Sequence, residues 1–230
     1  PWPNTVNNSA CPWPDYDADN KKYNHAMKNK YLILTAQVIS MLFSPFYFPV
    51  VAFIVLLIFS YMKLFPLGYK ISLLAMVYLF TIVMPRLGIY VYRRNGWTRH
   101  QLGRRERRFV PYLLSIVSYA CLLFLMQRMH MPRFTLSIII TALVLQIICA
   151  LLNSFVKIST HSAAAAGVVG MLLAFSMLFA FDPTYWLCLT ILMTGAVNTS
   201  RLILRQHTLG QIEISNLVGF LCGLLTILLI

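Results

Sequence analysis

The sequence predicts an all-α, polytopic membrane protein, built as a bundle of about six to seven membrane-spanning helices. Of its 230 residues, 59% are hydrophobic and only 11% are charged. Apolar segments of about 20 residues, each long enough to cross a bilayer of about 30 Å, recur along the chain. The alternating polar and apolar pattern of transmembrane barrel strands is absent. Because helices satisfy their backbone hydrogen bonds internally, they are the expected form of these segments.

The chain divides into a polar tail, residues 1–30, and a membrane domain, residues 31–230. The tail is rich in Pro, Asn and Asp and has no apolar core of its own. We expect the apolar segments of the membrane domain at residues 31–62, 71–92, 109–127, 134–154, 162–180, 185–203 and 211–230. Pro45 and Pro49 interrupt the first segment, which should therefore bend into two pieces that make one net crossing.

Two of the expected spans contain residues that indicate more than contact with lipid. Arg86 lies inside the second span, and two interpretations stay open for it. A buried arginine in a membrane helix indicates a functional role, whereas an arginine near the helix end can extend its charge to the head groups. Ala163–Gly167 and Gly170 give the fifth span a face of small residues, which predicts close packing against another helix.

The net charge of +13 lies mostly beside the apolar segments. The densest group is a loop at residues 93–108, whose arginines are Arg93, Arg94, Arg99, Arg104, Arg105, Arg107 and Arg108. Anionic head groups and a phosphorylated substrate explain this placement. Because no recognisable nucleic-acid-binding module surrounds the loop, we expect no nucleic-acid partner. The six acidic residues do not pair near the histidines and the five cysteines lack Cys-x-x-Cys spacing, so we expect no metal or other cofactor.

A group of polar residues occupies the junction between the last two apolar segments. Arg201 offers a fork of donors that fits phosphate oxygens. His207 and Gln211 are spaced i, i+4 and share a face if the stretch is helical. A second histidine, His161, follows Lys157 at the end of another apolar segment. Two histidines with nearby cations can cleave a phosphate ester, because one imidazole attacks phosphorus while the other protonates the departing alcohol.

Counting spans places these residues on one face of the membrane. One helical hairpin leaves the arginine-rich loop and returns at Lys157. A second hairpin leaves His161 and returns at Arg201. Each hairpin crosses the membrane twice, so the arginine-rich loop and both histidine-containing stretches should meet.

These three polar stretches resemble the signatures of the type 2 phosphatidic acid phosphatase superfamily, a family of membrane-bound lipid phosphatases. Residues 200–211 are similar to the third signature, Ser-Arg-x5-His-x3-Asp, with Gln211 where the pattern has aspartate. Lys157–His161 resembles the second, Pro-Ser-Gly-His, in a Lys-Ile-Ser-x-His form. Residues 104–111 loosely resemble the first, Lys-x6-Arg-Pro. The resemblance covers roughly the C-terminal half of the chain.

The resemblance implies a division of roles among these residues. His207 would be the nucleophile, and His161 would be the general acid toward the leaving oxygen. Gln211 would orient His207 in place of the aspartate, accepting a hydrogen bond without supplying negative charge. The residues expected to hold the phosphoryl group are Lys157, Ser159, Arg201, Arg105 and Arg108.

We therefore expect a membrane-embedded phosphatase that acts through a phosphohistidine on phosphatidate, phosphatidylglycerophosphate, polyprenyl diphosphate or a similar lipid. Its expected surroundings are the lipid bilayer of the inner (cytoplasmic) membrane of a bacterium. The missing aspartate leaves an alternative open, an inactive or weak relative that binds or transports anionic lipids. The arginine-rich loop favours a cytoplasmic site by charge bias. Catalysis itself requires cations there, so the face that carries the site stays open.

Overall fold

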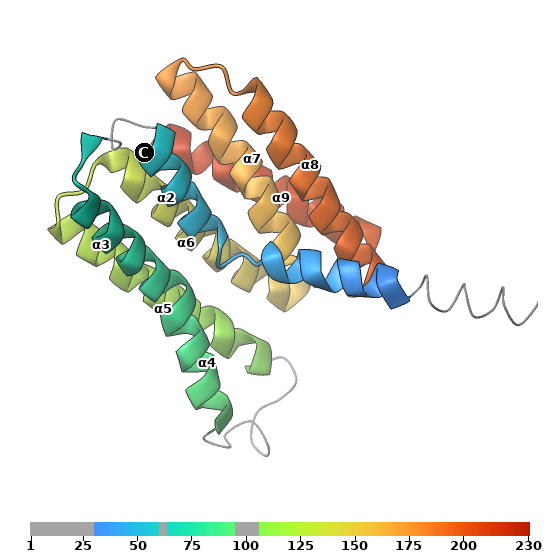
Figure 1. Ribbon diagram of the computed structural model, residues 1–230. Coiled ribbons are helices and arrows are strands. Elements are labelled where there is room, and N and C mark those ends of the chain that lie inside the picture. Colours follow the sequence, from blue (N-terminus) through green and yellow to red (C-terminus); the bar gives the residue numbers. More distant parts are fainter. Residues whose placement is uncertain (1–29, 60–63, 95–105) are drawn as a thin grey trace, which may run out of the picture.

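Three stretches of the chain are described by the computed structural model: residues 30–59, 64–94 and 106–230. For Phe59, Arg93 and residues 106–110 only the backbone is described. All regular structure in these stretches is helical, without a strand. Six of the helices are long and apolar enough to cross a membrane. The predicted fold class, an all-α polytopic membrane bundle, is confirmed (Figure 1).

The helices of spanning length follow one another in an up-and-down order (Figure 1). The first is continuous through α3 (Leu67–Tyr78), a π-helical turn (Leu79–Val83) and α4 (Met84–Arg94). The other five are α5 (Glu106–Arg128), α6 (Arg133–Phe155), α7 (Thr160–Phe179), α8 (Thr184–Ile203) and α9 (Leu209–Leu229). The connections from α5 to α9 are only a few residues long, so consecutive helices there run antiparallel.

The first apolar segment is broken at its prolines, as predicted, but it supplies no helix of spanning length. A helix at Lys30–Leu42 is followed by a bend and then by α2 (Phe48–Phe59). At a rise of 1.5 Å per residue each piece is only about 20 Å long, shorter than a bilayer core. The helix Lys30–Leu42, drawn in blue, lies across the ends of α7 and α8, whereas α2 runs beside the bundle (Figure 1). The expected single crossing is thus replaced by two short helices in different directions.

The π-helical turn allows α4 to contain a proline while the helix stays continuous from α3 through α4. Pro85 lacks a backbone N–H, and its ring crowds the preceding helical turn. The wider turn at Leu79–Val83 comes directly before it. Ser118 of α5 donates a hydrogen bond from Oγ to the carbonyl oxygen of Phe80 at 2.8 Å. The carbonyl therefore has a partner from the neighbouring helix, which also fixes α5 against this turn.

Arg86 takes an arrangement that neither sequence interpretation anticipated. Its Nη2 donates a hydrogen bond to the Tyr47 hydroxyl at 2.7 Å. The guanidinium carbon lies 5.4 Å from the centre of the Tyr47 ring, within the range of a cation–π interaction. Arg86 thus ties α4 to the bend between the helix Lys30–Leu42 and α2.

The start of α5 differs from the prediction. The sequence places residues 93–108 in a loop, whereas α5 already begins at Glu106 and so includes Arg107 and Arg108. Hydropathy marks where the apolar part of a helix starts, but the helix itself continues into its charged flank.

Small residues bring α7 and α9 into backbone contact, which confirms the predicted small-residue face of residues 163–170. On α7, a Cβ atom at Gly170 would lie 2.2 Å from the carbonyl oxygen of Phe220. On α9, a Cβ atom at Gly219 would lie 2.0 Å from the carbonyl oxygen of Ala163, and one at Gly223 would lie 2.2 Å from that of Gly167. Only residues without a side chain permit this spacing. The partner stripe on α9 was not foreseen.

Candidate active site

The C-terminal ends of α6 and α8 and the N-terminal ends of α7 and α9 meet on one side of the bundle, as span counting predicts (Figure 1). Lys157 lies between α6 and α7, and its Nζ donates a hydrogen bond to the carbonyl oxygen of Gln206, between α8 and α9, at 2.7 Å. His161 is in the first turn of α7. Lys157, His161 and His207 line the same cavity. The second and third polar stretches are therefore brought together.

Ser159, predicted to hold phosphate, occupies a structural position in the described site. It is fully buried and is the N-cap of α7, where its Oγ accepts from the backbone N–H of Ser162 at 3.4 Å. The Oγ atoms of the two serines are also 2.9 Å apart. The backbone N–H of Ser159 donates to Ser215 Oγ on α9 at 2.9 Å, and Ser215 Oγ donates to the carbonyl oxygen of Gln211. Ser159 thus connects the start of α7 to the first turns of α9.

Arg201 lies in the last turn of α8 and reaches the helix at the start of the described chain. Its Nη1 donates a hydrogen bond to Ser40 Oγ at 3.0 Å, across 161 residues of sequence. Its Nε is buried and has no hydrogen-bond partner in the described structure. The guanidinium is close enough to both His161 and His207 to act on them electrostatically. Arg201 therefore has donor capacity left for an anion beside the two imidazoles.

A tight turn after α8 directs His207 toward this cation. Arg205 has a φ of 50°, in the left-handed region, and its N–H donates to the carbonyl oxygen of Leu202 at 2.9 Å. The N–H of Gln206 donates to the carbonyl oxygen of Arg201 at 3.2 Å. This is the pattern of a left-handed helix end, which satisfies the last carbonyl groups of α8. The chain reverses within a few residues, and His207 lies between the ends of α8 and α9.

The side-chain amide of Gln211 has a fixed orientation because two donors share its oxygen. Thr208 is the N-cap of α9, and its backbone N–H donates to Gln211 Oε1 at 3.3 Å, as in a capping box. His207 Nδ1 is also 3.3 Å from the same oxygen. The Gln211 amide oxygen has no hydrogen, so it can only accept hydrogen bonds, from His207 as well as from Thr208. Nδ1 of His207 must therefore carry the imidazole hydrogen. The lone pair of His207 is then on Nε2, the nitrogen that is free to attack.

The environment of His207 favours its neutral form. Partial burial lowers the pKa of His207 below the usual 6.5, and the positive charge of Arg201 lowers this pKa further. Lys157 acts in the same direction, while the hydrogen bond to Gln211 opposes it. A lowered pKa keeps the imidazole unprotonated, and therefore nucleophilic, to lower pH than an exposed histidine.

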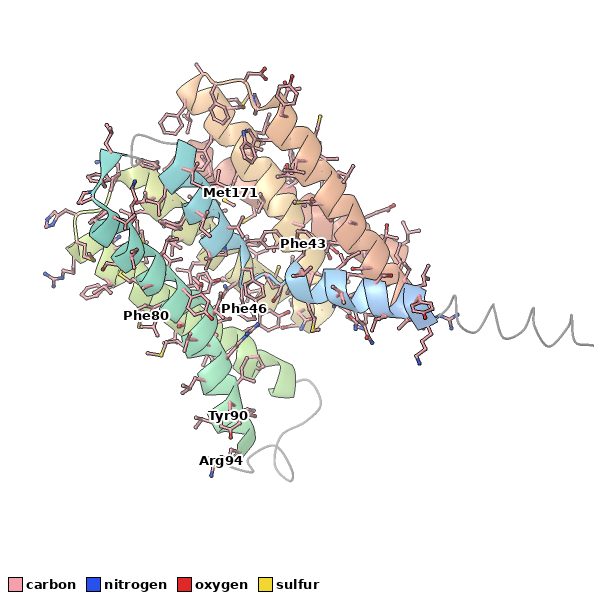
Figure 2. All side chains as sticks on the ribbon, viewed as in Figure 1. Phe43, Phe46, Phe80, Tyr90, Arg94 and Met171 are labelled. Atoms are coloured by element: carbon pink, nitrogen blue, oxygen red, sulfur yellow. The ribbon has the colours of Figure 1, made fainter. Side chains whose placement is uncertain are left out.

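The cavity beside these residues has a volume of about 520 Å³ and a largely apolar wall. Its polar end carries Lys157, His161 and His207. Phe46 and Met171, both labelled in Figure 2, belong to the apolar part of its lining. The cavity thus combines a cationic end with a hydrocarbon-lined interior, which suits an amphiphile with an anionic head.

Two predicted phosphate ligands cannot be placed at this site. Arg105 lies outside the described residues. Arg108 lies in α5, where only its backbone is described. The next residues of the same helix, Pro111 and Tyr112, line the cavity, so the start of α5 is next to it.

Several site residues escaped the sequence analysis. Ser40 binds Arg201, and its backbone interacts with the His161 side chain. It carries no sequence signal, because it is one serine in an apolar segment far from either partner. Tyr119 and Gln146 line the cavity from α5 and α6. Gln146 was detectable in principle, since an amide side chain inside a strongly apolar span is costly unless it has a use.

Within the described stretches, no three His, Cys, Asp or Glu side chains come together as metal ligands would. Comparisons with protein-family models, with curated proteins and with solved structures found no match for this chain.

Proposed function

We propose that the chain is a membrane-embedded phosphatase of the type 2 phosphatidic acid phosphatase superfamily, acting on a lipid phosphate or diphosphate through a phosphohistidine. One observation carries the proposal: Lys157, His161 and His207 share the polar end of a cavity whose remaining wall is mostly apolar. Lys157 in the cavity wall and Arg201, which acts electrostatically on both histidines, match a phosphoryl group, and the apolar wall matches the hydrocarbon chain attached to it.

In the first step, the lone pair on His207 Nε2 forms a bond to phosphorus as the bond from phosphorus to the lipid oxygen breaks. The departing oxygen takes a proton from His161 and leaves as the lipid alcohol, or as the lipid monophosphate when the substrate is a diphosphate. The Nδ1–H of the phosphoimidazole continues to donate to Gln211 Oε1. A phosphoryl group bound beside Arg201 brings negative charge next to His161, which favours the protonated form that this step needs.

In the second step, His161 accepts a proton from water as the water oxygen attacks phosphorus. The electron pair of the nitrogen–phosphorus bond returns to His207 Nε2, and inorganic phosphate is released. Lys157 and Arg201 stabilise the charge on the phosphoryl oxygens in both steps. Both histidines end in their starting protonation states, so the cycle is complete.

Phosphatidate, phosphatidylglycerophosphate and polyprenyl diphosphate all present a phosphoryl group on a hydrocarbon chain, and all suit this site. Six spans of apolar helix favour a membrane location, and we place the protein in the inner membrane of a bacterium. A second candidate function is the binding or transport of anionic lipids without turnover. Gln211 favours it, because a neutral amide cannot stabilise an imidazolium by charge.

The first experiment separates these two functions. We expect His207→Asn to release no phosphate from any of these lipids, whereas His130→Asn should behave as wild type. His130 is a matched control because it lies in the turn between α5 and α6, and its φ of 53° is one that asparagine tolerates. Wild-type protein quenched during turnover of radiolabelled lipid should carry phosphate on His207. Full phosphatase activity in His207→Asn would falsify the phosphohistidine mechanism, and lipid binding without phosphate release by wild type would establish the second function.

The role of His161 has a separate test. His161→Asn should slow the hydrolysis of an alkyl lipid phosphate by about 10²–10⁴-fold, the range for loss of a general acid. The first step is followed alone by alcohol release in a single turnover, because His161 also acts as the base in the second step. In that measurement an aryl phosphate ester, whose leaving oxygen needs no proton, should be cleaved with a much smaller loss. Equal losses on both esters would show that His161 does not protonate the leaving group.

A further inference from the structure

Three side chains in the wall of the cavity have a buried polar atom without a hydrogen-bond partner in the described structure: His161 at the polar end, and Tyr119 and Gln146 in the apolar part. Tyr119 of α5 is fully buried, and its hydroxyl makes no hydrogen bond. Oε1 of Gln146, on α6, is also buried and has no partner. Both residues line the cavity, and their side chains lie within interaction distance of each other, although no hydrogen bond of ordinary geometry joins Tyr119 Oη to Gln146 Oε1. An unpaired polar atom in an apolar interior costs stability, so its presence calls for a ligand.

The other hydroxyl groups nearby do not share this feature. Ser115 and Thr141 also line the cavity from the same two helices. Ser115 Oγ donates to the carbonyl oxygen of Tyr112 at 2.9 Å, and Thr141 Oγ1 donates to that of Ser137 at 2.7 Å. Among the buried side-chain nitrogen and oxygen atoms in the described parts of α5 and α6, those without a partner are Tyr119 Oη and Gln146 Oε1.

The pair lies deeper in the membrane domain than the phosphate end of the cavity. Gln146 precedes the end of α6 at Phe155 by nine residues, which corresponds to about 14 Å along the helix axis. Lys157 and His161 lie just beyond that end. A ligand whose phosphoryl group contacts Lys157 would therefore reach Tyr119 and Gln146 with its hydrocarbon chain and not with its head group.

The chemistry of the pair defines the group that it would bind. Gln146 Oε1 can only accept a hydrogen bond, so the ligand must donate one. The Tyr119 hydroxyl can donate in return, so the same ligand group should also accept. An aliphatic hydroxyl does both through one oxygen atom, whereas an ester carbonyl only accepts and a plain hydrocarbon does neither.

We propose that Tyr119 and Gln146 form a hydroxyl-binding subsite, and that the cavity selects lipid phosphates with a hydroxyl on the hydrocarbon chain. All-hydrocarbon polyprenyl phosphates would leave both atoms unpaired and would bind more weakly. The inference rests on the proposed function for the position of the phosphoryl group. Its test measures binding, so it does not depend on turnover.

The experiment uses the full chain in lipid nanodiscs and non-hydrolysable phosphonate analogues of stearoyl lysophosphatidate. One series carries an added hydroxyl that is moved along the stearoyl chain, and the reference lipid has only the glycerol hydroxyl that all members share. At one chain position we expect the hydroxyl to tighten binding by about tenfold to a hundredfold, the gain from two added hydrogen bonds. Tyr119→Phe and Gln146→Leu should each remove most of this preference, which is measured in every variant as the ratio of its affinities for the hydroxylated and the reference lipid.

Ser115→Ala is the matched control, because it removes a cavity hydroxyl that is already paired, and it should keep the preference. Both test variants delete unpaired polar atoms, so their thermal stability should equal or exceed that of wild type. Each variant removes one of the two hydrogen bonds to the ligand hydroxyl, so a preference that survives in either variant counts against the subsite. If no chain position is preferred, or if the preference survives in the variants, the subsite is refuted, and water or a direct hydrogen bond between Tyr119 and Gln146 satisfies the two atoms. A protein that shows the preference but releases no phosphate keeps the subsite and refutes the phosphatase.

Discussion

The contact between α7 and α9 predicts that Gly219→Ala is severely destabilising. The added Cβ atom would lie 2.0 Å from the carbonyl oxygen of Ala163, and 2.7 and 2.8 Å from its carbonyl carbon and Cα. All three are backbone atoms, so no side-chain rotation can relieve the overlap. Ordinary contacts begin near 3.4 Å, so the helices must separate locally by 3.4 − 2.0, or about 1.4 Å.

The energetic cost can be estimated from two opposing effects. Forced overpacking in a close-packed interior costs about 1–3 kcal/mol or more, and the close approaches at Gly170 and Gly223 would loosen together with it. Replacing glycine by alanine in a helix returns up to about 1 kcal/mol. Gly195 of α8 isolates the second effect, because a Cβ atom there meets nothing within 4 Å. Gly195→Ala should therefore be neutral or slightly stabilising.

We expect the two variants to differ by about 3 kcal/mol in stability, which for a chain of this size corresponds to about 6–12 °C in Tm. Thermal unfolding of both purified proteins in the same detergent measures this difference. Gly219→Ala should also lower phosphatase activity at temperatures where it remains folded, because His161 is only two residues from Ala163 on α7. If Gly219→Ala proved as stable as Gly195→Ala, the close packing of α7 on α9 would be refuted.

Three further predictions concern the site. The proposed mechanism uses neutral His207 as the nucleophile, and the pKa of His207 is lowered, first by burial and then by Arg201. The acid limb of kcat/KM should therefore lie below the usual titration range of histidine. Arg201→Gln should move this acid limb to higher pH, and an unmoved limb would refute the electrostatic coupling. Gln211→Glu places a carboxylate at the end of a side chain of the same length. We expect the charge-assisted hydrogen bond to raise the pKa of His207 and to increase kcat about fivefold. An unchanged kcat and pH profile would mean that charge at this position is unimportant. Ser40→Ala removes the hydrogen bond to Arg201 and should lower kcat/KM by about fivefold, whereas Thr35→Ala on the same helix, whose hydroxyl bonds its own backbone, should have no effect.

Much of the fold follows from properties that are local in the sequence. Hydropathy summed over about 20 residues marks six spans, because the cost of burying polar groups in lipid depends on composition and length. Pro45 and Pro49 mark the break in the first apolar segment, because proline removes a donor wherever it stands. The proximity of Lys157 and His207 also follows from the sequence. A hairpin that crosses the membrane twice returns the chain to the same face, so both residues are placed on one side of the membrane.

The contacts between helices could be seen only in the tertiary structure. They depend on how one helix is rotated and shifted along its axis against another, and neither property is encoded in a local stretch of sequence. Hydropathy could not show that the helix Lys30–Leu42 crosses the ends of α7 and α8, so Ser40 was not connected to Arg201. It could not show that Ser159 caps α7 and bonds Ser215.

The spacing of His207 and Gln211 placed the two side chains on one face, but it left the orientation of the amide free. The backbone N–H of Thr208 determines that orientation, and with it the nitrogen of His207 that carries the lone pair. In the same way, composition marks Tyr119 and Gln146 only as two polar residues in separate spans. Packing of α5 on α6 brings them together at the cavity, because side-chain neighbours across an interface are set by register and not by sequence distance.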